Sequence, residues 1–91
     1  MTELALVISV YNEEGNLQKL ADSLKRSLEG INWVALFVND GSIDGSKKIL
    51  DTLCESDPNH YKTLHFSKNY GHEAAMIAGI DHVISEAVIC M

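Results

Sequence analysis

Two short runs of apolar residues dominate the first 40 residues of the sequence. Residues 4–10 read LALVISV and residues 33–38 read WVALFV. Nearly continuous apolar runs of this length are typical of strands that are buried on both faces of a parallel sheet. Between them, residues 16–28 repeat their apolar side chains at helical spacing, at Leu17, Leu20, Ala21, Leu24 and Leu28. A strand, an amphipathic helix and a second strand are therefore predicted in that order.

The alternation of strands and helices continues to the end of the chain. Helices are predicted over residues 46–55 and 73–85, and strands over residues 61–66 and 87–91. The strand at 61–66 is less apolar, so we place it nearer an edge of the sheet. The helix at 73–85 is apolar around most of its circumference and is expected to be deeply packed. This order predicts an α/β fold of three layers, Rossmann-like, with a parallel sheet of about four strands and helices on both faces.

Composition narrows the possible partners and the cellular location. The formal net charge is −6, which argues against nucleic acid as a partner because such proteins need basic surfaces. No basic leader is visible at the start, and no apolar run approaches the ~20 residues that span a bilayer. Cys54 and Cys90 lack metal-binding spacing and are expected to be buried thiols. We therefore expect a cytoplasmic location.

Polar residues follow each of the first three predicted strands. Residues 11–14 (YNEE), 39–45 (NDGSIDG) and 67–72 (SKNYGH) are rich in carboxylates, amides and glycines. Because the carboxyl ends of parallel strands meet at one edge of a sheet, these segments are expected to form a binding site there.

The residue types in these segments suit a nucleotide. Tyr11 offers a flat face to a base or covers an edge of the core, and Glu13 and Asp40 are acceptors for ribose hydroxyls or for the N–H of a base. Gly41 and Gly45 permit close approach of the backbone, whose amides can then bind phosphate at the start of the second helix.

Other residues near the predicted site have competing interpretations. Lys68 can neutralise a phosphate or be an ordinary surface lysine. Asp44 is expected to be an N-cap rather than a ligand, and Glu14 a solvated charge. The pattern Asp40-x-Ser42-x-Asp44-Gly45 matches the first half of a calcium loop, although a predicted strand precedes it instead of a helix.

The histidines lack the spacing of metal ligands. No pair of them forms an HxH or HxxxH pattern, so surface or packing roles are expected for His60, His65, His72 and His82.

Three ordered blocks of the sequence resemble the N-terminal half of family 2 glycosyltransferases of the GT-A fold. These blocks are residues 7–14 (VISVYNEE), residues 38–46 (VNDGSIDGS), and residues 66–75 (FSKNYGHEAA) with Gly79 after them. The third block is most similar to the transferases that move sugars to polyisoprenyl phosphates, such as bactoprenol and dolichyl-phosphate sugar transferases. Residues 1–91 would then be the N-terminal, nucleotide-binding part of a GT-A domain.

The resemblance implies a role for particular residues. Ser9 to Glu13 would line the nucleotide, with Tyr11 near the base and Glu13 near the ribose, and Asp40 would contact the base. The loop from Lys68 to Gly71 would lie close to the diphosphate. The family's metal motif, Asp-x-Asp, ends the fourth strand, about where this chain ends, so neither a metal ligand nor a catalytic residue is expected within it.

Three positions depart from the family's usual pattern. Ser9 stands where proline is frequent, and Asn39 stands where many members have a first aspartate. Ser85-Glu86 replaces a common Gly-Asp pair. None of these departures removes a residue of the expected nucleotide site.

The implied activity belongs to a longer protein. It would transfer a sugar, with inversion, from a UDP- or GDP-sugar to a polyisoprenyl phosphate at the cytoplasmic face of a membrane, with Mg²⁺ or Mn²⁺ as cofactor. This chain alone is expected to hold no metal and to be inactive. The unfinished sheet edge is expected to make it self-associate. The alternative hypothesis is a non-catalytic module that binds a nucleotide or Ca²⁺.

Overall fold

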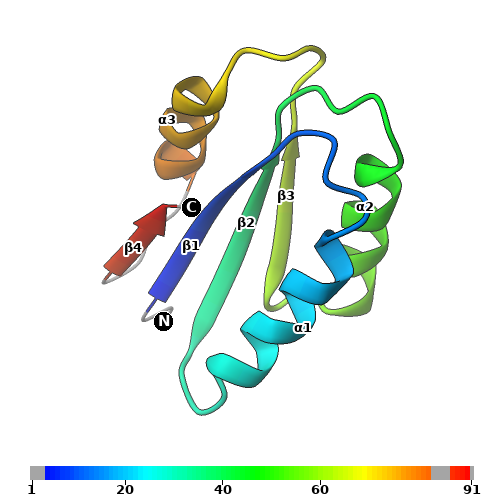
Figure 1. Cartoon of the computed structure of the whole chain (residues 1–91). Coiled ribbons are helices and arrows are strands. Elements are labelled where there is room, and N and C mark those ends of the chain that lie inside the picture. The colour runs from blue at the N-terminus through cyan, green and yellow to red at the C-terminus, as the bar shows by residue number, and fades with distance from the viewer. Residues whose placement is uncertain (1–3, 83–86, 91) are drawn as a thin grey trace.

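Strands and helices alternate along the whole chain. A computed structural model describes residues 4–82 and 87–90, and the side chains of residues 4–80. The elements are β1 (Leu4–Val10), α1 (Leu17–Ser27), β2 (Trp33–Asn39), α2 (Ser46–Ser56), β3 (Tyr61–His65), α3 (His72–His82) and β4 (Ala87–Cys90), as Figure 1 shows. The predicted end of the third helix, the Ser85-Glu86 pair, Met91 and the side chains of His82 and Cys90 lie outside this description. Within it, no helix is long and apolar enough to cross a membrane.

The four strands form one parallel sheet in the order β3-β2-β1-β4. The ends of the first three strands are in register, since Val10 pairs with Asn39 and Asn39 pairs with His65. β3 lies at an edge, as its lower apolar content predicted. The register brings the loops that follow β1, β2 and β3 to one rim of the sheet (Figure 1).

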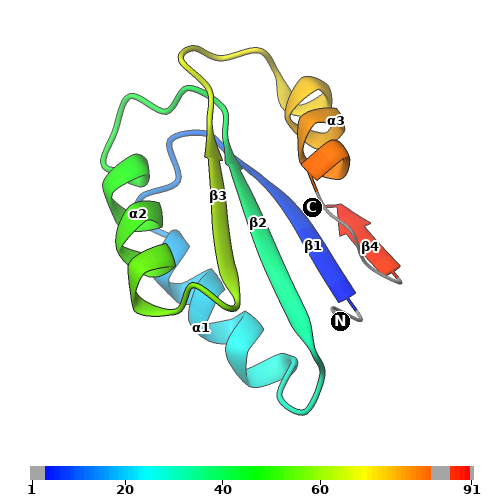
Figure 2. The ribbon, with the colours of Figure 1, turned by 180° about the vertical axis from the view of Figure 1, so that it is seen from behind.

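Helices cover both faces of the sheet, which confirms the predicted three-layer α/β architecture. α1 and α2 lie on one face and α3 on the other, as both views show (Figures 1 and 2). Alternate residues of each strand supply the two cores. Ile8 and Phe37 belong to the core under α1 and α2, whereas Val7 and Val38 belong to the core under α3.

The packing of α3 differs from the prediction. Ala75 and Gly79 are buried against the sheet, but Ile77 is 63% exposed and Ile80 is 46% exposed. A Cβ at Gly79 would overlap Cγ1 of Val7, so the helix rests on the sheet through its small residues. One sheet face buries only one side of a helix, and Ile77 and Ile80 lie on the other side. The expectation of deep packing for this helix is therefore wrong among the described residues.

Candidate functional site

The loops after β1 and β2 are joined by side-chain hydrogen bonds. The amide of Asn12 donates to Oγ of Ser42 at 3.0 Å, and the amide of Ile43 donates to Oδ1 of Asn12 at 2.9 Å. The amide of Glu13 donates to Oγ of the buried Ser46 at 3.0 Å. These bonds fix the first loop against the start of α2.

Two carboxylates accept hydrogen bonds from backbone amides at the start of α2. Oε2 of Glu14 accepts from the amide of Gly45 at 3.0 Å, and Oδ1 of Asp44 accepts from the amide of Ser46 at 2.9 Å. Hydrogen bonds from the side chain and amide of Ser46 lower the pKa of Asp44, which keeps this carboxylate ionised. The N-cap position belongs to Gly45 rather than to Asp44. The amide of Gly45 is thus not available for phosphate, and Glu14 has a partner although its side chain is exposed.

Asp40 connects the second loop to the third. Its side chain is only 3% exposed. Oδ1 accepts from the amide of Tyr70 at 2.7 Å, while Oδ2 accepts from the amide of Gly71 at 2.9 Å and from Nδ2 of Asn69 at 3.2 Å. Such charge-assisted bonds to a buried carboxylate are strong. Asp40 therefore determines where the third loop lies.

Gly41 allows the same two loops to touch. It has φ +70°, and a Cβ there would overlap the backbone of Lys68 and Asn69. Only glycine tolerates both the positive φ and this close approach. The requirement for glycine at this position is thus explained by packing, whatever ligand the rim binds.

A pocket of ≈ 440 Å³ lies between the three loops, and we call it the rim pocket. It brings together most of the residues predicted to bind a nucleotide, and two further residues from the third loop and α3: Ser9, Tyr11, Glu13, Asp40, Asn69, Gly71 and His72. The Tyr11 side chain is 46% exposed, so its ring remains accessible to a ligand. The predicted meeting of the three strand ends is confirmed, whereas the binding role of these residues stays a prediction.

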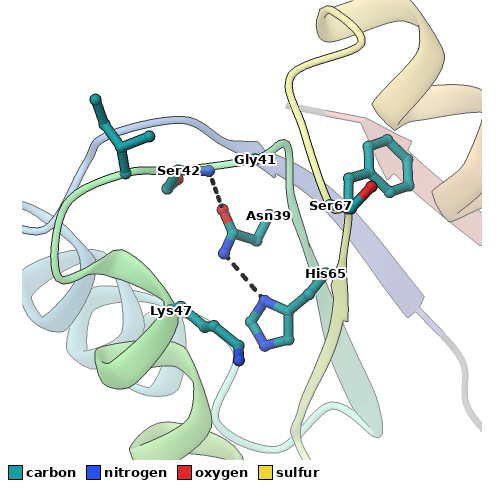
Figure 3. Close-up of a pocket in the computed structure, with 8 residues that line it drawn as sticks. Asn39, Gly41, Ser42, Lys47, His65 and Ser67 are labelled. Atoms are coloured by element: carbon teal, nitrogen blue, oxygen red, sulfur yellow. Dashed lines mark hydrogen bonds between the residues drawn. The ribbon is translucent and has the colours of Figure 1, made fainter.

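Lys68 and Gly41 do not line the rim pocket. Nζ of Lys68 lies 5.3 Å from the ring centroid of Tyr70, and the Tyr70 ring stands edge-on to Phe66. Gly41 lines a second pocket of ≈ 430 Å³, shown in Figure 3, with Asn39, Ser42, Ile43, Lys47, His65, Phe66 and Ser67. Of the seven residues predicted to bind a nucleotide, five therefore line the rim pocket. Gly41 lines the second pocket, and Lys68 lies exposed at the surface.

A chain of polar contacts lies beside the second pocket. The amide of Ser42 donates to Oδ1 of Asn39 at 3.1 Å, so the NH₂ group of Asn39 faces Nδ1 of His65, 3.0 Å away (Figure 3). The other ring nitrogen of His65, Nε2, lies 2.8 Å from Oδ1 of Asp51. Nδ1 must accept, so Nε2 carries the hydrogen that Asp51 accepts. The buried Asn39 thus has a structural partner at each end of its side-chain amide.

Sequence reasoning gave no individual role to two residues of the rim pocket, Asn69, which lies within the loop from Lys68 to Gly71, and His72. Nδ1 of His72 lies 2.6 Å from Oγ of Ser9, 63 positions earlier in the chain. Their membership in the third polar segment was the only available signal, since a contact over this separation depends on how α3 lies against β1.

The described residues offer no obvious metal site. Among residues 4–82 and 87–90, no group of three or more His, Cys, Asp and Glu side chains could hold a metal ion. Asp40 and Asp44, the two aspartates of the possible calcium loop, instead accept hydrogen bonds from backbone amides. We therefore assign no metal ligand to this part of the chain.

Comparison with known families gives the geometry a context. The profile described as "Glycosyl transferase family 2" matches residues 5–91. The chain belongs to glycosyl transferase family 2. The rim pocket thus lies at the carboxyl ends of the first strands of a family 2 domain, and the resemblance seen in the three sequence blocks is confirmed.

The chain is also similar to longer proteins, two of which have a polyisoprenyl lipid in their names. The chain is 37% identical over 90 residues to the putative glycosyltransferase CsbB of Bacillus subtilis, covering 97% of this chain and 27% of that protein. It is 34% identical over 89 residues to the prophage bactoprenol glucosyl transferase homolog of Escherichia coli, covering 96% and 29%. It is 30% identical over 91 residues to the undecaprenyl-phosphate 4-deoxy-4-formamido-L-arabinose transferase of Salmonella choleraesuis, covering 98% and 28%. The chain thus spans less than a third of the length of these relatives.

Proposed function

We propose that this chain is the nucleotide-binding part of an enzyme that transfers a sugar from a nucleotide-diphosphate sugar to a polyisoprenyl phosphate. Family membership supports sugar transfer. The names of the relatives, bactoprenol and undecaprenyl-phosphate transferases, support a lipid phosphate as acceptor. The donor would be a UDP- or GDP-sugar, and the longer protein would act at the cytoplasmic face of a membrane.

The rim pocket is the observation that carries this proposal. An accessible tyrosine ring, Tyr11, and a carboxylate, Glu13, line one hollow with the buried Asp40. A ring and a carboxylate suit the base and ribose of a nucleoside. In this arrangement Asp40 acts mainly by positioning the third loop, since both of its oxygens accept hydrogen bonds from that loop.

The reaction itself would use residues beyond this chain. A divalent ion, Mg²⁺ or Mn²⁺, would neutralise the leaving diphosphate. We propose that the longer protein supplies its ligands and the acceptor site, and that transfer proceeds with inversion. Residues 1–91 would then bind the donor without turning it over.

Transfer by the longer protein that contains this chain tests the proposal. The protein in vesicles is given undecaprenyl phosphate, Mn²⁺ and either UDP-glucose or GDP-mannose, and labelled sugar in the lipid is measured. We expect transfer from one donor. Tyr11→Ala should lower kcat/KM about five- to 150-fold, because stacking of a base on an aromatic ring contributes about 1–3 kcal/mol.

A second tyrosine at the same rim provides the matched control. Tyr70 is similarly exposed, but its ring lies outside the rim pocket. Tyr70→Ala should change kcat/KM by less than about threefold, on the order expected for a surface change. Absence of transfer from either donor, or equal effects of the two variants, would contradict the proposed function.

A further inference from the structure

His72 has a defined position at the wall of the rim pocket. It is the first residue of α3, and its Nδ1 lies 2.6 Å from Oγ of Ser9. Ser9 is one position before the end of β1 and points to the same face of the sheet as Val7, because side chains alternate along a strand. That face is the one that α3 covers. Ser9 and His72 therefore meet because the Ser9 side chain points to the face of the sheet on which α3 lies.

The helix that carries His72 is fixed against the sheet. Ala75 is buried and its amide donates to the carbonyl of Gly71 at 3.1 Å. Further along, the backbone at Gly79 lies so close to Val7 and Val38 that a Cβ would meet both side chains. The loop before the helix is held in turn by Asp40 through the amide of Gly71. The imidazole of His72 thus projects from a supported backbone.

His72 differs from the other two histidines whose side chains are described. Nδ1 of His60 lies 2.9 Å from Oδ2 of Asp57, and Nε2 of His65 lies 2.8 Å from Oδ1 of Asp51. The partner of His72 is a hydroxyl, and its Nε2 has no hydrogen-bond partner among the described residues. A positive charge on His72 would therefore not be cancelled by a hydrogen-bonded carboxylate.

The hydroxyl of Ser9 suits both protonation states of the ring. A serine hydroxyl donates to an unprotonated Nδ1 and accepts from a protonated one. In either state Nε2 can carry a hydrogen and donate it to a ligand. Protonation thus changes the charge of the His72 ring without moving it. His65 differs, because its Nδ1 faces the NH₂ group of Asn39 and could not keep that hydrogen bond if it carried a hydrogen.

The titratable side chains near His72 come from all three loops and from α3. From the first loop, Tyr11 and Glu13 line the pocket, and Asp40 lines it from the second loop. Glu73 follows His72 on α3, and Lys68 in the third loop lies over the Tyr70 ring rather than in the pocket. Among the described residues that line the pocket, His72 is therefore the one that can gain a positive charge.

We propose that His72, held by Ser9, binds the diphosphate of the nucleotide sugar and makes the affinity for it rise as the pH falls. The inference rests on the proposed function, since it assumes that the rim pocket holds a nucleotide sugar. A phosphate group beside Glu13 and Asp40 needs a compensating positive group, and the partial positive charge of the α3 N-terminus adds to that of the ring. Histidines gain their charge as the pH falls through about 6.5.

Binding of UDP-glucose and GDP-mannose to the chain as a function of pH tests this inference. Their diphosphates lack the terminal ionisation near pH 6 that a phosphate monoester shows, so the ligand keeps its charge. We expect Kd, measured by NMR titration up to millimolar ligand, to be about three- to tenfold lower at pH 5.5 than at pH 8, because a hydrogen bond from a charged donor is stronger than one from a neutral donor. The imidazole signals of His72 should shift when ligand is added.

Four variants separate the role of His72 from a structural one. His72→Gln should abolish the pH dependence, and His72→Lys should keep the low Kd at both pH values. Ser9→Ala should reduce the effect of pH because the ring loses its orienting partner. His60→Gln, at a histidine paired with Asp57 outside the pocket, should leave the pH profile unchanged.

Two results would overturn the inference, and they differ from each other. Equal pH profiles for the original chain and His72→Gln, with binding retained, would remove the role of His72 and leave the proposed function standing. Absence of binding of either nucleotide sugar at every pH would contradict the proposed function as well.

Discussion

At the scale of single residues, Asp40 shows how a polar side chain can shape a site by holding a neighbouring loop in place. The resemblance to family 2 glycosyltransferases implied a contact between Asp40 and the base. In the structure its two carboxylate oxygens accept from the amides of Tyr70 and Gly71 and from the side chain of Asn69. The contact with the base stays a prediction, while the position of the third loop depends directly on this carboxylate.

Replacement of Asp40 by asparagine should loosen the third loop. Asp40→Asn would turn an NH₂ group toward a backbone N–H and leave a buried donor without an acceptor, which costs about 1–3 kcal/mol. We expect a lower free energy of unfolding in urea and faster hydrogen exchange at the amides of Tyr70 and Gly71.

The matched control is Asp22→Asn on the exposed face of α1, where the carboxylate accepts a hydrogen bond from Gln18. Its effect on the free energy of unfolding should stay within about 0.5 kcal/mol. Equal effects of the two substitutions would contradict the role of Asp40.

Contacts between distant side chains mark the limit of what the sequence predicts at this scale. The three polar segments were identified correctly because each follows an apolar strand. The bond between Ser9 and His72, and the chain from Asn39 through His65 to Asp51, could not be inferred. Such bonds depend on rotamers and on how each helix lies against the sheet, which periodicity does not encode.

At the scale of elements, the strands were predicted more accurately than the packing of the last helix. The apolar run predicted the observed bounds of β1, Leu4–Val10, because burial on both faces makes every residue of the strand except Ser9 apolar. The composition of α3 predicted burial all round, yet Ile77 is exposed. Composition reports how apolar a helix is, but not how many neighbours cover it.

A cluster at the opposite end of the sheet joins α1 to the segment between α2 and β3. Oδ2 of Asp57 lies 3.1 Å from Nζ of Lys25 and 2.9 Å from Nδ1 of His60. The His60 ring stacks on Trp33 with 4.4 Å between ring centroids. Burial acts to raise the pKa of Asp57, but the hydrogen bonds from His60 and Lys25 outweigh it, so the pKa lies below the ordinary 3.8.

This pKa makes the stability depend on pH in acid. A carboxyl group with a lowered pKa in the folded state stabilises the fold above its ordinary pKa and loses that effect as the pH falls through its folded value. The free energy of unfolding should therefore decrease below about pH 4. Asp57→Asn should show a smaller decrease when urea unfolding is compared between about pH 5 and pH 3.

The exposed Asp22 again serves as the control. Asp22→Asn should show the same decrease in the free energy of unfolding between about pH 5 and pH 3 as the unsubstituted chain. An equal decrease in the free energy of unfolding for Asp57→Asn and the unsubstituted chain would show that Asp57 does not contribute to the dependence of stability on pH.

At the scale of the whole molecule, the two ends of the sheet have different tasks. At the end with Trp33, Asp57 and His60, ion pairs and stacked rings hold α1 and the segment between α2 and β3 together. The other end carries three polar loops, joined to one another by hydrogen bonds, around the rim pocket (Figure 1). The parallel register of the sheet explains this division, because it brings every strand-to-helix loop to the same rim.

The most direct test follows the backbone amides of the labelled chain by NMR while UDP-glucose or GDP-mannose is added. Binding in the rim pocket predicts that the largest shifts occur at Ser9, Tyr11, Glu13 and Gly71, which line it, with little change at Lys25 and Asp57 at the other end. Shifts confined to that other end, or no shifts with either nucleotide sugar at millimolar concentration, would contradict a nucleotide site between the three loops.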